Sequence, residues 1–133
     1  MGLKTTYTAR TFDLSDLTGI SNETLAMHFK LYEGYVTNTN TLNQRIADLI
    51  GSGELDATQV AAFSELKRRF GFEYNGMVLH EYYFENLAPK GRGKPSNEFN
   101  EAIKKCFGSF DSWKQAFVAV GEMRGVGWAI LYQ

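Results

Sequence analysis

Two long amphipathic patterns, separated by the short segment GSGE at residues 51–54, constrain this chain more than any other feature of its sequence. In the first pattern, side chains that are mostly apolar or aromatic recur at alternating steps of three and four residues: Leu25, His28, Tyr32, Tyr35, Thr39, Leu42, Ile46 and Leu49. Ser21, directly before the pattern, is a good N-cap. This spacing predicts one long helix over about residues 22–50.

The second pattern begins near Asp56 or Thr58 and ends before Pro89. Its members have the same spacing: Phe63, Leu66, Phe70, Tyr74, Met77, His80, Phe84 and Leu87. Each predicted helix has about 28 residues and would be about 40 Å long at 1.5 Å per residue. Because only a few residues join them, we expect an antiparallel helical hairpin.

The last third of the chain predicts shorter elements. A short helix is expected over residues 97–106, with Phe99, Ile103 and either Cys106 or Phe107 on one face. A further helix follows residue 109 or 111 and runs to residue 123, and residues 128–132 are typical of a buried strand. A strand needs a partner for its backbone groups. Either another chain supplies that partner, or the sequence is the N-terminal part of a longer protein.

Composition excludes several classes of function. The 133 residues carry a formal net charge of -1, so no basic excess draws the chain to nucleic acid or anionic lipid. No apolar run approaches the roughly 20 residues of a membrane span. The single cysteine, Cys106, rules out an intrachain disulfide and suits a reducing compartment. Since the N-terminus lacks the apolar core of a signal peptide, we expect a cytoplasmic protein.

The chain has only two histidines, His28 and His80, and both lie on the amphipathic patterns. A single histidine on an apolar face is more often a hydrogen-bonded core residue than a ligand. Here, however, His28 lies about 26 positions before the turn and His80 about 26 positions after it, so both rings should meet across one seam. Two buried neutral imidazoles lack matching donors and acceptors unless other polar groups help. A metal ion resolves this, because imidazole suits Fe, Zn, Cu and Ni.

Aromatic side chains accompany the histidines. Tyr35 follows His28 by seven residues on the same helix face, so its phenol should point toward the site as a donor or proton relay. Tyr83, Phe84 and Trp128 could form an aromatic wall, together with the other tryptophan of the chain. Taken singly, each of these aromatic residues is equally typical of ordinary core packing.

Four segments now resemble one known family, the iron/manganese superoxide dismutases. Residues 28–40, HFKLYEGYVTNTN, resemble the family's first helix, where a ligand histidine precedes a site tyrosine. Residues 72–89, FEYNGMVLHEYYFENLAP, resemble the second helix with its ligand histidine. FGSFD at 107–111 and GVGW at 125–128 resemble the start of the C-terminal domain and its first strand. Together the four segments extend the resemblance over about residues 7–133.

The resemblance implies a fold, an activity and a site. The fold would be mainly α: a hairpin domain over residues 1–89, then helices of a truncated α/β domain over 90–133 that ends at its first strand. The activity would be disproportionation of superoxide at one Fe or Mn per chain, in a protein that commonly forms homodimers. His28 and His80 would be metal ligands and Tyr35 the proton relay. Residues around these three would include Tyr83, Phe84, Gly76 and Trp128.

The chain also departs from the family pattern. Leu31 and Tyr32 stand where the common form has two further histidines, and the spacing from His28 to Tyr35 is one residue shorter. Phe84 replaces a frequent tryptophan. Gly76 stands where many iron enzymes place a glutamine that binds metal-bound solvent.

The largest departure concerns the ligands. The family's Asp-x-Trp-x-x-His motif, which supplies two of four ligands, is absent from this sequence. The alternatives are therefore a catalytically degenerate relative that acts as a structural or weak metal-binding module, and a small hairpin that dimerises and shares its histidines. For residues 128–132 we expect pairing with a second chain, disorder, or packing against the helix before them, and pairing is favoured.

Overall fold

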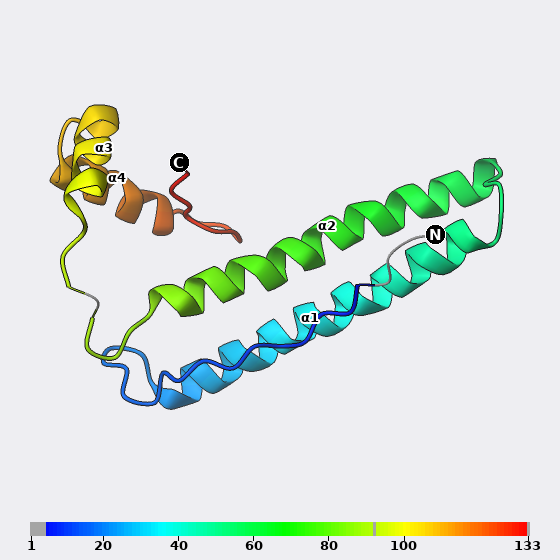
Figure 1. Cartoon of the computed structure of the whole chain (residues 1–133), viewed down its shortest axis with the longest axis horizontal. Helices are drawn as coiled ribbons and strands as arrows, with labels where there is room; N and C mark the ends of the chain where they lie inside the picture. The colour runs from blue at the N-terminus through cyan, green and yellow to red at the C-terminus, as the bar shows by residue number, and fades with distance from the viewer. Residues whose placement is uncertain (1–4, 92, 133) are drawn as a thin grey trace. The chain divides into compact units, whose positions relative to one another are not determined.

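The computed structural model describes residues 5–91 and 93–132, and these include four helices. The long helices α1 (Asn22–Gly51) and α2 (Ala57–Asn86) pack against each other as an antiparallel hairpin (Figure 1). Their bounds confirm the two helices predicted from the amphipathic patterns. Five members of the predicted stripe on α1 are buried, namely Leu25, Tyr32, Thr39, Leu42 and Ile46, and Val36, which was not predicted, is buried with them.

Both long helices begin with side-chain caps. The hydroxyl of Ser21 accepts a hydrogen bond from the backbone N–H of Thr24 at 3.1 Å. At the start of α2, Asp56 accepts from the N–H of Gln59, and the Gln59 side chain accepts from the N–H of Asp56, both at 2.9 Å. This reciprocal capping box satisfies two backbone donors that the helix itself cannot pair. It fixes where the chain turns back and so sets the register between α1 and α2.

Before α1, residues 5–14 form an extended segment that runs beside α1, which we call the N-terminal strap (Figure 1). Asn43 donates to the carbonyl oxygen of Thr5 at 2.7 Å. Asn40 exchanges two hydrogen bonds with the backbone of Tyr7, both at 2.8 Å. No helix or strand was predicted for this segment. The strap instead satisfies its backbone through amide side chains of a neighbouring helix, in the manner of an added strand.

The main core lies where the strap meets the hairpin. Leu14 from the strap is buried with residues of both long helices: Leu25, Tyr32, Val36, Met77 and Phe84. Phe12 of the strap stacks on the ring of Phe29 and lies 5.1 Å from that of Phe84. The strap is therefore part of the core and closes one end of the helical seam.

The chain divides into two compact units after Gly91. The second unit contains α3 (Asn97–Phe107) and α4 (Phe110–Gly121), which pack against each other. Ile103 is the buried residue of α3, whereas Cys106, one of the two alternatives for the predicted apolar face, is exposed.

The expected strand at the end of the chain does not form within the described residues, which reach position 132. The reason is physical, since a strand is defined by backbone pairing and the described part of the chain offers it no partner strand. Ile130 and Leu131 instead line an apolar hollow of about 140 Å³ with Trp113 and Phe117 of α4. Of the three alternatives for this segment, packing against the preceding helix is the one that the structure contains.

Candidate metal centre

The two histidines lie next to each other across the hairpin seam. The ring centroids of His28 and His80 are 4.8 Å apart, with their planes at 79°. The matched distances of the two residues from the turn predicted this meeting. His80 is 3% exposed, and His28 is half-buried. Two imidazoles from different helices thus lie against each other at one level of the hairpin.

Backbone chemistry fixes which nitrogen of His80 carries its proton. Nδ1 lies 2.6 Å from the carbonyl oxygen of Gly76, one helical turn earlier. Because a carbonyl only accepts, Nδ1 must hold the proton and donate it, and the ring lone pair is then on Nε2. A histidine that donates one N–H to a backbone carbonyl while its other nitrogen holds the lone pair is the usual state of a metal ligand.

Burial favours the neutral form of both rings, because it lowers the pKa of each. The pKa of His28 is lowered from its ordinary value, first by loss of solvent and then by the neighbouring His80. The pKa of His80 is also lowered by burial, partly opposed by the hydrogen bond to Gly76. Neutral imidazole is the form that binds metal ions, so the two rings are in the protonation state that a metal site needs.

Tyr35 lies beside this pair, and Gly76 makes its position possible. The Tyr35 ring centroid is 5.1 Å from that of His80. A side-chain carbon built on Gly76 would lie 2.5 Å from Cε1 and 2.8 Å from Cγ of Tyr35. The ring of Tyr35 therefore occupies the space that any larger residue at position 76 would need.

Of the other aromatic residues predicted near the histidines, two lie close to His28. The rings of Tyr83 and Phe84 lie 5.0 Å and 5.1 Å from the ring of His28, so both contribute to the expected aromatic wall. Phe84 is 1% exposed. Trp128 belongs to the second compact unit, and its expected place near the histidines stays a prediction.

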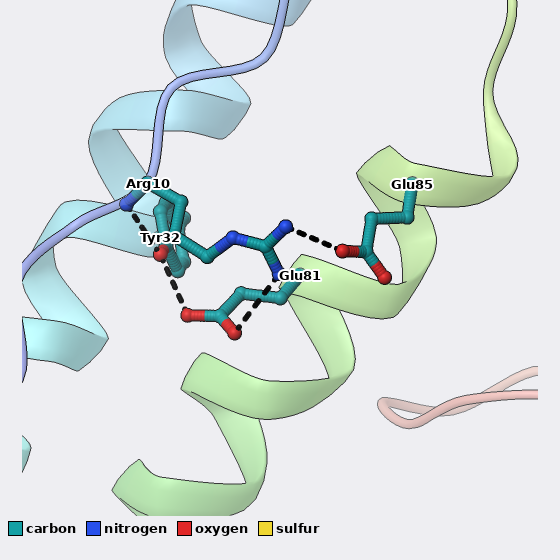
Figure 2. Close-up of polar contacts among 4 residues, drawn as sticks. All are labelled: Arg10, Tyr32, Glu81 and Glu85. Carbon is teal, nitrogen blue, oxygen red and sulfur yellow. Dashed lines mark hydrogen bonds and ion pairs between the residues drawn. The ribbon is translucent and has the colours of Figure 1, made fainter.

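A polar cluster that borders the site was not predicted from the sequence (Figure 2). The hydroxyl of Tyr32 accepts from the backbone N–H of Arg10 at 2.9 Å and donates to Oε1 of Glu81 at 2.8 Å. The guanidinium of Arg10 lies 3.6 Å from Glu81 and 2.5 Å from Glu85. Burial raises the pKa of Tyr32, which keeps its phenol protonated and able to donate. Glu81 and Glu85, which follow His80 on the same helix, are thus engaged with the strap.

A second charged group was also missed. Glu73 is 1% exposed, with its carboxylate 2.5 Å from Arg69 and 3.3 Å from the amide of Asn38. These three residues line a shallow cleft of about 210 Å³, together with Leu31, Gly34, Tyr35 and Phe72. The cleft gives the Tyr35 side of the site an opening to solvent.

The donor set fits half of a metal site. Within residues 5–91 and 93–132, no group of three or more His, Cys, Asp or Glu side chains is arranged to hold an ion. Two neutral imidazoles with fixed positions remain, and they match the ligand type that iron and manganese accept.

In the residues that the structure describes, no helix is long and apolar enough to cross a membrane.

Comparison with known proteins gives a consistent result. A family model of the C-terminal domain of iron/manganese superoxide dismutases matches residues 95–133. The Fe superoxide dismutase of Aquifex aeolicus (strain VF5) is 38% identical over 118 residues, which is 87% of this chain and 55% of that protein. The Fe superoxide dismutase of Saccharolobus solfataricus is 37% identical over 117 residues, 85% of this chain and 54% of that protein.

A manganese relative covers more of its own length. The mitochondrial Mn superoxide dismutase of Eptatretus stoutii is 34% identical over 114 residues, which is 84% of this chain and 76% of that protein. By contrast, the chain spans about half the length of the two iron relatives.

Proposed function

The chain belongs to the iron/manganese superoxide dismutase family, and from this we propose that it supplies the N-terminal part of a mononuclear Fe or Mn site. Such a site disproportionates superoxide to oxygen and hydrogen peroxide. The observation that carries the proposal is the 4.8 Å separation of the His28 and His80 rings across the hairpin seam. In domain terms, residues 1–89 would be the helical-hairpin domain and residues 90–133 the beginning of the C-terminal α/β domain.

Each residue has a separate task in this proposal. His28 and His80 would hold the metal, and His80 would use Nε2 because its Nδ1–H is bound to Gly76. When bound, the metal would oxidise one superoxide and reduce the next by cycling between M³⁺ and M²⁺. Tyr35 would move protons from the side of the site that the cleft opens to solvent.

The family site has four protein ligands, and the two given by the Asp-x-Trp-x-x-His motif are not in this sequence. We therefore expect the 133-residue chain to hold Fe, Mn or Zn weakly and substoichiometrically. It should show little or no superoxide dismutation. Elemental analysis after dialysis against a chelator measures the first quantity, and superoxide decay after pulse radiolysis measures the second. One metal per chain retained against the chelator would contradict this expectation.

The function itself is tested by restoring the missing ligands. A chimera would join this chain to the part of the Aquifex aeolicus enzyme that follows its match. We expect the chimera to hold one Fe or Mn and to consume superoxide, and His28→Ala and His80→Ala to abolish both. A folded, metal-loaded chimera whose turnover survived His80→Ala would contradict the assignment of His80.

A second candidate is a degenerate relative that acts as a structural, dimerising or weak metal-binding module. The absence of a cluster of three or more potential ligands among the described residues favours it. The chimera separates the two candidates, because a degenerate module would fail to give turnover even when the missing ligands are supplied.

A further inference from the structure

Tyr32 connects the N-terminal strap to the candidate metal site. It is 1% exposed, and its ring lies 6.2 Å from Phe12 of the strap. On the site side, the Tyr32 ring lies 6.3 Å from the imidazole of His80, with the two planes only 27° apart. One fully buried side chain therefore separates the strap from a candidate ligand.

The hydroxyl of Tyr32 both accepts and donates a hydrogen bond. It accepts from Arg10, 22 residues earlier, and donates to Glu81, 49 residues later. Phenylalanine would fill the same space, so packing alone does not require the hydroxyl. Burying a hydroxyl costs free energy unless it both donates and accepts a hydrogen bond, and here two distant segments supply the partners. The two hydrogen bonds hold the phenol at its oxygen end, which restrains the ring beside His80.

The orientation of His80 depends on such a neighbour. The bond to Gly76 fixes one ring nitrogen, but the tilt of an imidazole is set by the groups against its faces. Tyr35 and Tyr32 both lie near the His80 ring, with planes 36° and 27° from it. Of these two phenols, Tyr32 is the one whose hydroxyl is tied at 2.8 Å to Glu81, the residue next to His80.

We propose that Tyr32, held by Glu81 and by the backbone of Arg10, is a positioning residue that fixes the imidazole of His80. The strap thereby contributes to the site although it supplies no ligand. The proposal rests on the proposed function in one respect only, namely that the fixed imidazole of His80 serves as a metal ligand. By holding the ring of His80 in place, Tyr32 would keep Nδ1 against the carbonyl oxygen of Gly76, so His80 keeps its proton on Nδ1 in the metal-free chain.

The test compares Tyr32→Phe with Tyr82→Phe in the full chain with chelator present. Tyr82 is 59% exposed on the same helix as His80, so its variant removes the same atom from a solvent-facing ring. Long-range ¹H–¹⁵N correlation spectra at pH 8 report which imidazole nitrogen is protonated. We expect one Nδ1–H tautomer of His80 in the wild type and in Tyr82→Phe, and a mixture of both tautomers in Tyr32→Phe. An unchanged tautomer in a folded Tyr32→Phe would overturn the proposal.

Two substitutions of Glu81 give an independent answer should Tyr32→Phe fail to fold. Glu81→Gln and Glu81→Ala both lose the charge that faces Arg10, but the glutamine oxygen can still accept from Tyr32. We expect Glu81→Gln to retain the single tautomer and Glu81→Ala to lose it. Equal spectra for the two variants would overturn the proposal. Either the lost charge of Glu81 would then cause the change of tautomer, or no change would occur, and the hydrogen bond from Tyr32 would have no part in it.

Metal affinity separates this inference from the proposed function. With Co²⁺ as the probe, loss of the hydroxyl that holds Tyr32 against the His80 ring should weaken binding about 10-fold in Tyr32→Phe. If neither the wild type nor any variant binds Co²⁺ while the tautomer still changes, the positioning role stands and the metal function fails. If Co²⁺ binds equally to all variants and the tautomer is constant, the positioning role fails and the metal function stands.

Discussion

At the scale of single residues, Gly76 connects the backbone of α2 to the candidate metal site in two ways. Its carbonyl accepts the Nδ1 proton of His80, and its missing side chain leaves room for the ring of Tyr35. One position thus accepts the proton of a candidate ligand and leaves room for the candidate proton relay. The family resemblance indicated that the residue type at this position matters. It gave no indication that Tyr35 would lie directly over it.

We expect Gly76→Ala to destabilise the hairpin by about 1–3 kcal/mol, the usual cost of overpacking a filled space. The new methyl group would lie 2.8 Å from Cγ of Tyr35, so the whole ring must move and not only its far end. Urea unfolding followed by circular dichroism measures the change in the free energy of unfolding.

Gly71→Ala is the matched control for this prediction. Gly71 is also in the interior of α2, but a methyl group there would meet nothing within 4 Å. Helix propensity alone should then stabilise the chain by up to about 1 kcal/mol. If both substitutions stabilised the chain equally, the close approach of Tyr35 to Gly76 would be wrong.

The two histidines should make the stability of the metal-free chain depend on pH. Their pKa values are lowered in the folded state, so the unfolded chain binds more protons once the pH falls below the ordinary histidine pKa of 6.5. Stability is therefore fully present above this pH and decreases as the pH falls from 7 toward 5.5. Urea unfolding with chelator present gives the slope, and His28→Asn combined with His80→Asn should flatten it.

The residues of the site were predictable to different degrees. His28 and His80 could be paired by counting positions from one turn, because a straight hairpin preserves the count. Glu73 could not be predicted, since the sequence alone does not show which polar residue finds partners that allow its burial. The contacts of Tyr32 with Arg10 and Glu81 join three segments far apart in the chain, and no local pattern encodes such a meeting.

At the scale of elements, the caps determine where α1 ends and α2 begins. The side chains of Asp56 and Gln59 each accept a hydrogen bond from the backbone at the start of α2. We expect Asp56→Ala to lower the free energy of unfolding by about 1 kcal/mol. Glu54→Ala, in the same exposed turn, should change it by less than about 0.5 kcal/mol. Equal losses in urea unfolding would show that the capping box is not what stabilises this end of the hairpin.

The helices were predictable because each carries its own signal. Apolar spacing, Ser21 and the break at GSGE gave bounds within a residue or two of the observed Asn22–Gly51 and Ala57–Asn86. The strand at residues 128–132 was predicted from composition, but composition only shows that the segment suits a sheet. The strap was not predicted, because its hydrogen-bond partners are side chains of α1 and not a neighbouring strand.

At the scale of the whole molecule, the second compact unit leaves much apolar surface uncovered. Met123 is 70% exposed, Val126 is fully exposed and Tyr132 is 82% exposed. Each large apolar side chain left in water forgoes about 1.5–3 kcal/mol of burial. Exposed apolar surface of this kind favours association.

We therefore expect the 133-residue chain to form dimers at micromolar concentration. Light scattering coupled to size exclusion measures the mass, and Val126→Asp should shift the population toward monomer if residues 126–132 make the contact. A monomer whose last six residues are well protected in hydrogen exchange would contradict this prediction, since the segment would then have found its cover within the chain.

The strap also constrains the order in which the chain can assemble during translation. Arg10 leaves the ribosome early, but its partners Glu81 and Glu85 are made more than seventy residues later. The amides of Asn40 and Asn43 are likewise useful to the strap only after α1 has formed. The strap is thus synthesised before the helices that it docks on. A nascent chain stalled before residue 81 should keep the strap open to proteases, however complete its first helix is.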